Sequence, residues 1–134
     1  MPAERIFIDS NVMIYAYFKQ DEKKQRISKQ LIAQNAVIST QVLQEMTNTL
    51  HRKMGVDYSI VHSILQECLQ NCDINTNTSD TVLFALYIAK RYGFSFYDSL
   101  IVAAALESKC RTLYSEDMHH SQHIGNLTIK NPFA

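Results

Sequence analysis

The residues in this sequence that are best suited to chemistry are four carboxylates spread along the chain: Asp9, Glu45, Asp98 and Asp117. Each lies close to or within a segment that is expected to form a strand or a helix. Carboxylate oxygens are ligands for hard divalent cations such as Mg²⁺ or Mn²⁺. The sequence therefore predicts a metal site if the fold brings these four side chains to one place.

Two of these acids are expected at the carboxyl edge of a parallel sheet. Asp9 follows the short apolar run 6–8 of a strand predicted over 5–8, which suits a strand buried on both faces, and Asp117 follows a predicted strand over 111–114. Parallel strands end at the same edge, where ligands bind, so the two acids would meet if their strands are neighbours. Each also has an ordinary explanation, because Asp9 could cap the next helix and Asp117 could belong to an acidic turn.

The other two acids lie on predicted helices. Glu45 falls at the border of the apolar stripe of a helix over 41–54. A side chain there can reach over the edge of a sheet, although it is more often simply solvated. Asp98 stands three residues after Ser95, which is the spacing of a capping box. The helix that follows is apolar on nearly all sides, so Asp98 should lie near the interior and require a metal or a hydrogen-bonding partner.

Short predicted strands alternate with predicted helices, a pattern typical of an α/β domain with a parallel sheet. About five strands are expected, over 5–8, 36–38, 73–75, 111–114 and 127–129. The helices between them are expected over 12–18, 22–32, 41–54, 58–69, 81–92 and 98–106. Ser10 or Asn11 is expected to cap the first helix. With no internal repeat and no linker, the sequence predicts one domain over residues 1–134.

Composition limits the classes of partner and compartment. The formal net charge is zero, so no strong global field favours a polyanion or an anionic membrane. No apolar run reaches the roughly 18 residues of a membrane span, and the first residues lack a secretion signal, so we expect a cytoplasmic protein with no membrane partner.

Cys68 and Cys72 could form half of a zinc site, but they fit better as small core residues. The neighbouring histidines that follow Asp117 fit surface positions better than metal ligation: His119, His120 and His123.

Four segments taken together resemble the PIN-domain nucleases, most of all the VapC toxins of bacterial toxin–antitoxin pairs: 8–12, 39–45, 95–105 and 113–118. The resemblance covers the whole chain. It implies a central parallel sheet flanked by helices and an acidic site that hydrolyses RNA phosphodiester bonds with Mg²⁺ or Mn²⁺. It also implies a homodimer and a cognate antitoxin that blocks the site. Carried over to this sequence, the metal-binding acids are Asp9, Glu45, Asp98 and Asp117, supported by Ser10, Asn11 and Ser115.

The expected chemistry fits these acids. A phosphodiester repels hydroxide, and a bound divalent ion reverses the local charge and lowers the pKa of its water. We expect Asp9 and Asp98 to ligate the main ion, while Glu45 and Asp117 hold its waters or a second ion.

A phosphoryl-transfer protein of another α/β class is the first alternative, but it would usually need a lysine near the acids, and the only late-strand lysine is Lys130. The second alternative is a non-catalytic PIN-like binding module, against which the intact acids argue.

Contacts to RNA are expected from one of two basic clusters, which could equally be solvated faces. The first cluster is Lys23, Lys24, Arg26 and Lys29, and the second is Arg52 and Lys53. Phe96 and Tyr97 could stack on a base, although the sequence favours core packing for both.

Overall fold

The strand β1 (Ile6–Ile8) lies at the centre of a six-stranded sheet in the computed structural model, which describes residues 4–134. The strand order is β3-β2-β1-β4-β6-β5. The other strands are β2 (Ala36–Ser39), β3 (Asp73–Asn75), β4 (Thr112–Tyr114), β5 (His123–Ile124) and β6 (Leu127–Lys130). All neighbours are parallel except β5, which pairs antiparallel with β6. The three residues of β1 are all buried, as expected for a strand covered on both faces.

The predicted parallel sheet is confirmed, but the expected number of about five strands omits β5. This strand has only two residues and pairs His123 with Thr128 and Ile124 with Leu127. A segment that short carries no alternation of apolar and polar residues, so its sequence gives no strand pattern. Gly125 lies between β5 and β6 with φ +58°, a left-handed conformation that glycine adopts without strain.

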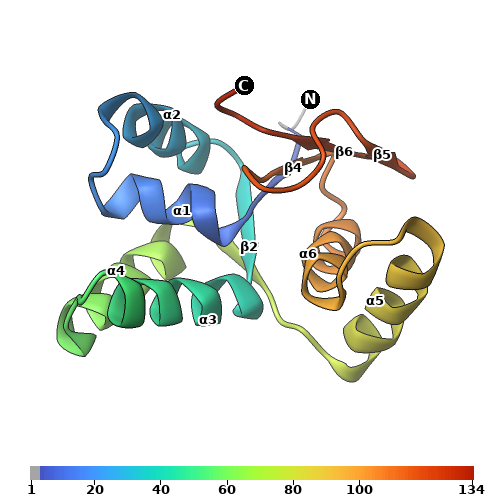
Figure 1. Ribbon diagram of the computed structural model, residues 1–134, viewed down its shortest axis with the longest axis horizontal. Coiled ribbons are helices and arrows are strands. Elements are labelled where there is room, and N and C mark those ends of the chain that lie inside the picture. The colour runs from blue at the N-terminus through green and yellow to red at the C-terminus, as the bar shows by residue number, and fades with distance from the viewer. Residues whose placement is uncertain (1–3) are drawn as a thin grey trace.

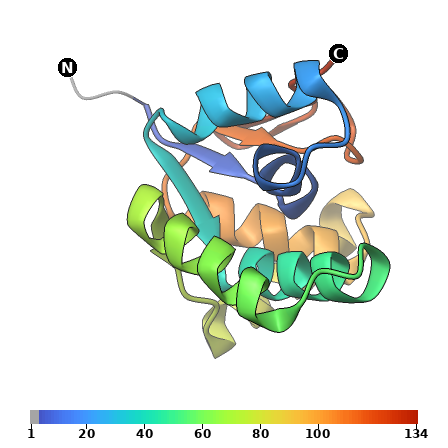
Figure 2. The same cartoon turned by 90° about the vertical axis from the view of Figure 1, so that its left-hand side faces the viewer.

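Six α-helices surround the sheet: α1 (Ser10–Tyr17), α2 (Glu22–Ile32), α3 (Thr40–Asn48), α4 (Tyr58–Asn71), α5 (Ser79–Tyr92) and α6 (Phe96–Glu107). Figure 1 shows α5 and α6 packed side by side at one end, with α1 and α2 at the other. In the turned view of Figure 2, α2 lies on one side of the strands and α4 on the other. Among these described helices, none combines the length and the apolar character that a bilayer span requires.

The helix predicted over 41–54 is not α-helical throughout. It continues from α3 into the π-helical segment η1 (Thr49–Lys53), where the amide of Met54 donates to the carbonyl of Thr49. The sequence of this segment contains no proline or glycine that would mark the change. Gly55, with φ +68°, follows the end of the helix, as the sequence predicted.

The N-cap of α6 agrees with the sequence, whereas that of α1 differs. The hydroxyl of Ser95 accepts from the amide of Asp98, as the capping-box spacing predicted, and Ser39 and Thr78 cap α3 and α5 in the same way. The prediction that Ser10 or Asn11 caps α1 is wrong, because the helix already begins at Ser10 and Asp9 is its N-cap. Asp9 as the cap is the other explanation that the sequence offered, and the pattern alone does not decide between them because all three residue types are good caps.

The helix α6 forms the centre of one side of the core, as its apolar sequence predicted. Residues 99–105 are all buried, and the helix contacts α3, α5, β2 and β4. Because burial fixes this helix, it also fixes the position of its first turn at the sheet edge.

The predicted core positions of Cys68 and Cys72 are confirmed, and Cys110 is also buried as a free thiol. Burial raises the pKa of Cys68 to about 11, of Cys72 to about 12 and of Cys110 to about 11. The three histidines predicted at the surface, His119, His120 and His123, are exposed.

Candidate functional site

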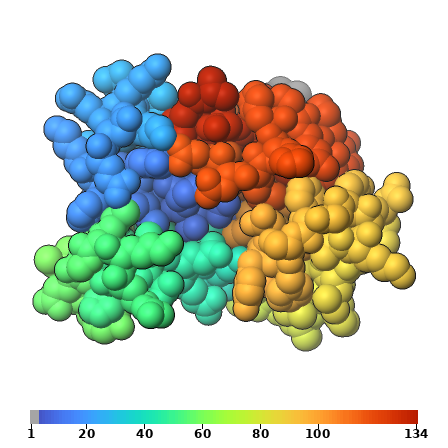
Figure 3. Space-filling view, in the orientation of Figure 1, coloured from blue at the N-terminus to red at the C-terminus, as the bar shows by residue number. Residues whose placement is uncertain are grey.

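The four carboxylates singled out in the sequence line one cavity of about 300 Å³ at the carboxyl edge of the sheet. Asp9 follows β1, Glu45 lies on α3, Asp98 lies in the first turn of α6, and Asp117 lies just after β4. Since β1 and β4 are neighbouring parallel strands, both deliver an acid to the same edge. Figure 3 shows the segments that carry these acids bordering one another near the middle of the visible face.

Asp9 is held rigidly at this edge. Its amide donates to the carbonyl of Tyr114 at 2.9 Å, which extends the pairing of β1 with β4 by one residue. The residue is only 7% exposed, and its carboxylate accepts two hydrogen bonds. One comes from the amide of Ser10 at 2.7 Å and the other from the hydroxyl of Ser115 at 2.9 Å. Asp9 therefore combines the role of helix cap with a fixed position in the cavity.

Within the cavity, Asp9 has a pKa that is shifted from its ordinary value. Burial raises the pKa of Asp9 to about 6, and the nearby charges of Glu45 and Asp98 add to this shift. The hydrogen bonds from Ser10 and Ser115 act in the opposite direction, because they stabilise the ionised carboxylate. A carboxyl group in a cavity whose pKa is raised by burial and by other acids marks a candidate functional site.

Glu45 reaches the cavity from the border of the apolar stripe of α3. The buried residues of the stripe are Val42, Met46 and Leu50, whereas Glu45 is half-buried. The hydroxyl of Ser10 donates to Oε1 of Glu45 at 3.0 Å, and the amide of Gln41 donates to Oε2 at 3.3 Å. Since the backbone amide of Ser10 also contacts Asp9, Ser10 connects these two acids directly.

Asp117 is exposed, and Asn11 holds its carboxylate. The side-chain amide of Asn11 donates to Oδ2 of Asp117 at 3.0 Å. Its side-chain oxygen, Oδ1, accepts from the backbone amide of Glu116 at 3.4 Å. The side chain of Glu116 is occupied elsewhere, because it accepts from the hydroxyl of Tyr15 at 2.9 Å and forms an ion pair with Lys24. Asp117, rather than Glu116, therefore faces the cavity.

Asp98 differs from the other three acids because its carboxylate has no hydrogen-bond or ionic partner within residues 4–134. Its amide donates to the hydroxyl of Ser95 at 3.2 Å, so only half of the predicted capping box forms. The sequence placed Asp98 near the interior, and the structure shows it half-buried at the rim of the cavity. Its carboxylate is therefore available to a ligand.

The cavity has the donor types for a hard divalent cation. Four carboxylates line it, and Lys53 is the cation among its described lining residues. Across the described chain, however, no three Asp, Glu, His or Cys side chains stand close enough together to hold one ion. The fit to Mg²⁺ or Mn²⁺ therefore depends on the oxygen donor set and its uncompensated negative charge, not on a preformed ligand geometry.

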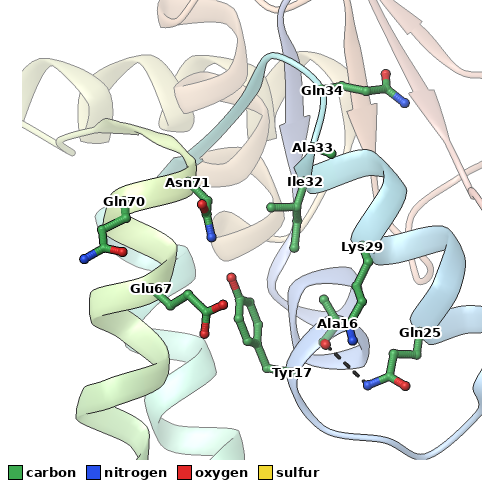
Figure 4. A pocket seen from close by; sticks show the side chains of 10 residues that line it. All are labelled: Ala16, Tyr17, Gln25, Lys29, Ile32, Ala33, Gln34, Glu67, Gln70 and Asn71. Atoms are coloured by element: carbon green, nitrogen blue, oxygen red, sulfur yellow. Dashed lines mark hydrogen bonds between the residues drawn. The ribbon is translucent and has the colours of Figure 1, made fainter.

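A larger cavity lies elsewhere. It has a volume of about 650 Å³ and lies between α1, α2 and α4, where Figure 4 shows its lining side chains. These side chains are mainly amide and aliphatic. The side-chain amide of Gln25 donates to the backbone carbonyl of Ala16 at 3.4 Å. None of its lining residues lines the acid cavity. Without a group of acids, this larger cavity offers no comparable chemistry.

Several residues of the acid cavity were not found from the sequence. Thr49 and Lys53 follow Glu45 by four and eight positions, so helical spacing could have placed both on the same face. The sequence indicated Lys53 only as a contact for RNA, not as a residue that lines the cavity of the acids. Gln20 lies in the connection between α1 and α2, where no periodic pattern marks it.

Comparisons with known proteins agree with this architecture. The sequence profile of the family described as PIN domain matches residues 6–123. No curated protein sequence matches the chain significantly.

Three solved structures with a similar fold are a toxin–antitoxin complex, a VapBC2 structure and a VapC toxin. A toxin–antitoxin complex from Klebsiella pneumoniae has a TM-score of 0.69 at 18% identity and covers 95% of this chain and 97% of that one. VapBC2 from Rickettsia felis, bound to a DNA fragment from their promoter, has a TM-score of 0.69 at 19% identity over 95% and 98%. VapC20 from Mycobacterium tuberculosis, a Sarcin-Ricin loop cleaving toxin, has a TM-score of 0.66 at 20% identity over 81% and 86%. At these identities the likeness establishes the fold.

Proposed function

Because this chain belongs to the PIN-domain family, we propose that it is an endoribonuclease that depends on Mg²⁺ or Mn²⁺. The observation that carries this proposal is the acid cavity, where four separate elements bring four carboxylates to one sheet edge. A site with this much unneutralised acid is suited to a divalent cation and, through it, to a phosphodiester. Family membership also excludes the alternative of a phosphoryl-transfer protein from another α/β class.

The four acids have different proposed roles. Asp9 and Asp98 would ligate the main ion, because Asp9 is the most buried of the four and the carboxylate of Asp98 has no described partner. Glu45 and Asp117 would hold its waters or a second ion. Mg²⁺ or Mn²⁺ bound there supplies a water of lowered pKa and stabilises the charge that develops on the phosphate.

Three polar residues act as positioning residues in this proposal, since each donates a hydrogen bond to one of the acids. Ser115 holds Asp9, Asn11 holds Asp117, and the hydroxyl of Ser10 holds Glu45. These bonds fix carboxylate orientations before any ligand arrives. Such preorganisation lowers the cost of assembling a metal site.

The test is cleavage of RNA by the purified protein. The wild type should cut RNA in Mg²⁺ or Mn²⁺ and lose this activity in excess chelator. Asp98→Asn should lose activity and keep its fold, because the capping bond to Ser95 uses the backbone amide of Asp98, which asparagine retains. The matched control is Asp73→Asn, an acid at the opposite end of a parallel strand that pairs with Arg5.

Equal RNA cleavage by the wild type and Asp98→Asn would show that the proposed site is wrong. If the wild-type protein cuts no RNA under any of these conditions, the remaining alternative is a non-catalytic PIN-like binding module.

The proposed biological role is that of the toxin in a type II toxin–antitoxin pair, acting on RNA in the cytoplasm. The similar folds of proteins from toxin–antitoxin complexes support this role. The proposed partners are a cognate antitoxin that blocks the acid cavity and a second copy of the chain. Expression of the wild type alone should slow bacterial growth, and coexpression of the protein encoded by an adjacent reading frame should restore it. Light scattering of the purified protein tests the homodimer.

A further inference from the structure

Three adjoining cavities form a continuous hollow that leads away from the four acids. The acid cavity shares Ser10, Glu45 and Thr49 with a second cavity of about 410 Å³. That second cavity shares Gln44 and Asn48 with a third of about 290 Å³. The hollow therefore follows the surface of α3 from the site of proposed chemistry into η1.

The floor of this hollow is formed by one face of a helix. Its polar side chains come from Gln41, Gln44, Asn48 and Arg52, which we call the α3 track. They recur at intervals of three or four residues, so they lie on the same side of the helix. Beyond Glu45, the described lining of the second and third cavities has no carboxylate. The lining of the hollow thus changes from acidic at the site of proposed chemistry to amide-rich and then basic.

An exposed aromatic side chain stands at the near end of the track. Tyr97 lines the second cavity and is 66% exposed, so the expectation that it packs in the core is wrong. The side-chain amide of Gln41 donates to the carbonyl of Tyr97 at 3.0 Å, which ties the start of α6 to α3. The ring of Phe96 contacts the Tyr97 ring edge to face at 5.5 Å. A fixed backbone and a packed neighbour hold this exposed ring beside Asp98.

A second aromatic platform stands at the far end. The rings of His51 and Tyr58 are stacked with centroids 3.7 Å apart and planes 14° from parallel, and both residues line the third cavity. Nδ1 of His51 lies 2.9 Å from the carbonyl oxygen of Val56, which fixes the imidazole. Tyr58 is 60% exposed although it is already stacked on one side, so its other face remains open to a ligand.

The position of the second basic cluster distinguishes this side of the molecule. In the first cluster, Lys24 is engaged in an ion pair with Glu116, whereas Lys23, Arg26 and Lys29 are exposed and form no ion pair with any described residue. In the second, Arg52 and Lys53 are exposed and form no ion pair with any described residue. Arg52 lines the third cavity and Lys53 lines the acid cavity. Two basic side chains without an ion-pair partner among the described residues therefore line the hollow.

We infer that the α3 track holds single-stranded RNA next to the bond that is cut, with one base stacked on Tyr97 and another on Tyr58. This inference rests on the proposed ribonuclease function and names the residues that position the substrate. Exposed rings can stack only on unpaired bases, because the faces of bases in a duplex are already covered. The amides of Gln44 and Asn48 can hydrogen-bond base edges or sugars, and Arg52 and Lys53 can contact phosphates.

The test measures binding of a fluorescent single-stranded RNA of about 12 nucleotides, a length within the range of single-strand binding sites. Binding is measured in the Asp98→Asn background, so that the RNA stays intact. Tyr58→Ala and Tyr97→Ala should each weaken binding by about fivefold to a hundredfold, the range for loss of one stacked base. Tyr97→Phe should bind like its parent because it keeps the ring. Tyr87→Ala is the matched control, since Tyr87 is also 60% exposed but lies on α5.

Two further readouts separate substrate positioning from a merely structural role. In the wild-type background, Tyr58→Ala should raise KM for RNA cleavage and leave kcat nearly unchanged. Arg52→Gln should reduce the slope of log affinity against log salt by about 0.7, the value for one phosphate contact with a single strand. A fully paired duplex should compete about tenfold less well than the single strand.

The inference is overturned if both tyrosine-to-alanine variants bind RNA as Tyr87→Ala does, if Tyr97→Phe loses as much affinity as Tyr97→Ala, or if the duplex competes equally. A change of oligomeric state in Tyr58→Ala or Tyr97→Ala with unchanged RNA binding would instead assign this face to a second copy of the chain. If the wild type cuts RNA while these variants behave normally, only the track is wrong. If the wild type neither binds nor cuts RNA, the proposed function fails together with it.

Discussion

Replacing Asp9 by asparagine should stabilise the protein in the absence of metal, although it removes a residue of the proposed site. Asparagine has the same shape and can keep both contacts, because its oxygen can accept from the Ser10 amide and its amide can donate to the Ser115 hydroxyl. What disappears is the cost of ionising a carboxyl group that is 7% exposed and lies near Glu45 and Asp98. Most substitutions at buried sites destabilise, so this direction is diagnostic.

The magnitude follows from the raised pKa of Asp9. Its pKa moves from 3.8 to about 6 on folding, and each unit is worth about 1.4 kcal/mol, so the ionised form destabilises the metal-free protein by up to about 3 kcal/mol. Below about pH 4 the carboxyl is protonated in both states and this cost is absent. As the pH rises, the unfolded chain releases the proton first, so stability falls until about pH 6 and then stays constant. For a chain of this size, about 3 kcal/mol corresponds to roughly 10 °C in Tm.

The assay is thermal unfolding of the wild type and Asp9→Asn in excess chelator at about pH 4 and about pH 8. The variant should melt higher at the upper pH, and the two should converge at the lower one. Excess Mn²⁺ should then stabilise the wild type by about 2.7 kcal/mol at a hundred times its dissociation constant, and the variant by much less. If chelated Asp9→Asn melts below the wild type at about pH 8, or if the difference between them does not depend on pH, the electrostatic account of the cavity is wrong.

Further predictions concern the surroundings of the site, the core and the cell. Ser115→Ala removes the hydroxyl that donates to Asp9, so it should cost about 1–3 kcal/mol of stability at about pH 8 in chelator and less at about pH 4, as measured by the same melts. Mn²⁺ affinity of the wild type, measured by calorimetry, should rise with pH through about 6, because Asp9 must lose its proton to ligate the ion. In growth assays at equal soluble expression, Asp9→Asn should relieve the slow growth caused by the wild type, and equal growth with both would remove the toxin role. Alkylation of the native protein should be slow and should become fast on unfolding at all three buried thiols, Cys68, Cys72 and Cys110.

The fold could be predicted from the sequence where a segment is long and periodic or uniformly apolar. The buried strand before Asp9 and the apolar helix after Asp98 both have strong patterns, and both form as expected. Asp9 and Asp117 meet because β1 pairs with β4, and the sequence alone could not establish that pairing. The two-residue strand β5 and the π-helical turn η1 have no pattern of their own, because tertiary packing determines them.

The environment of each acid was harder to predict than its position along the chain. Glu45 lies at the border of its helix as the pattern indicated, but the sequence could not show that the hydroxyl of Ser10 reaches it from another element. The free carboxylate of Asp98 depends on half of a capping box failing to form, which spacing alone does not reveal. Tyr97 was expected in the core because its neighbours are apolar, yet it is exposed at a helix start, where the helical periodicity has only begun. Whether these residues act as a catalytic site stays a prediction.

The most direct test of the central proposal is the binding of Mn²⁺ by the wild type and by four single variants, measured by calorimetry with paramagnetic resonance as a check. The variants are Asp9→Asn, Glu45→Gln, Asp98→Asn and Asp117→Asn, and the control is Asp73→Asn at the opposite end of the sheet. If the four acids form one site, each variant should bind Mn²⁺ at least about tenfold more weakly than the wild type, whereas the control should match it. Unchanged Mn²⁺ affinity in the four variants, or an equal loss in Asp73→Asn, would contradict the proposal that these four carboxylates form one metal-binding nuclease site.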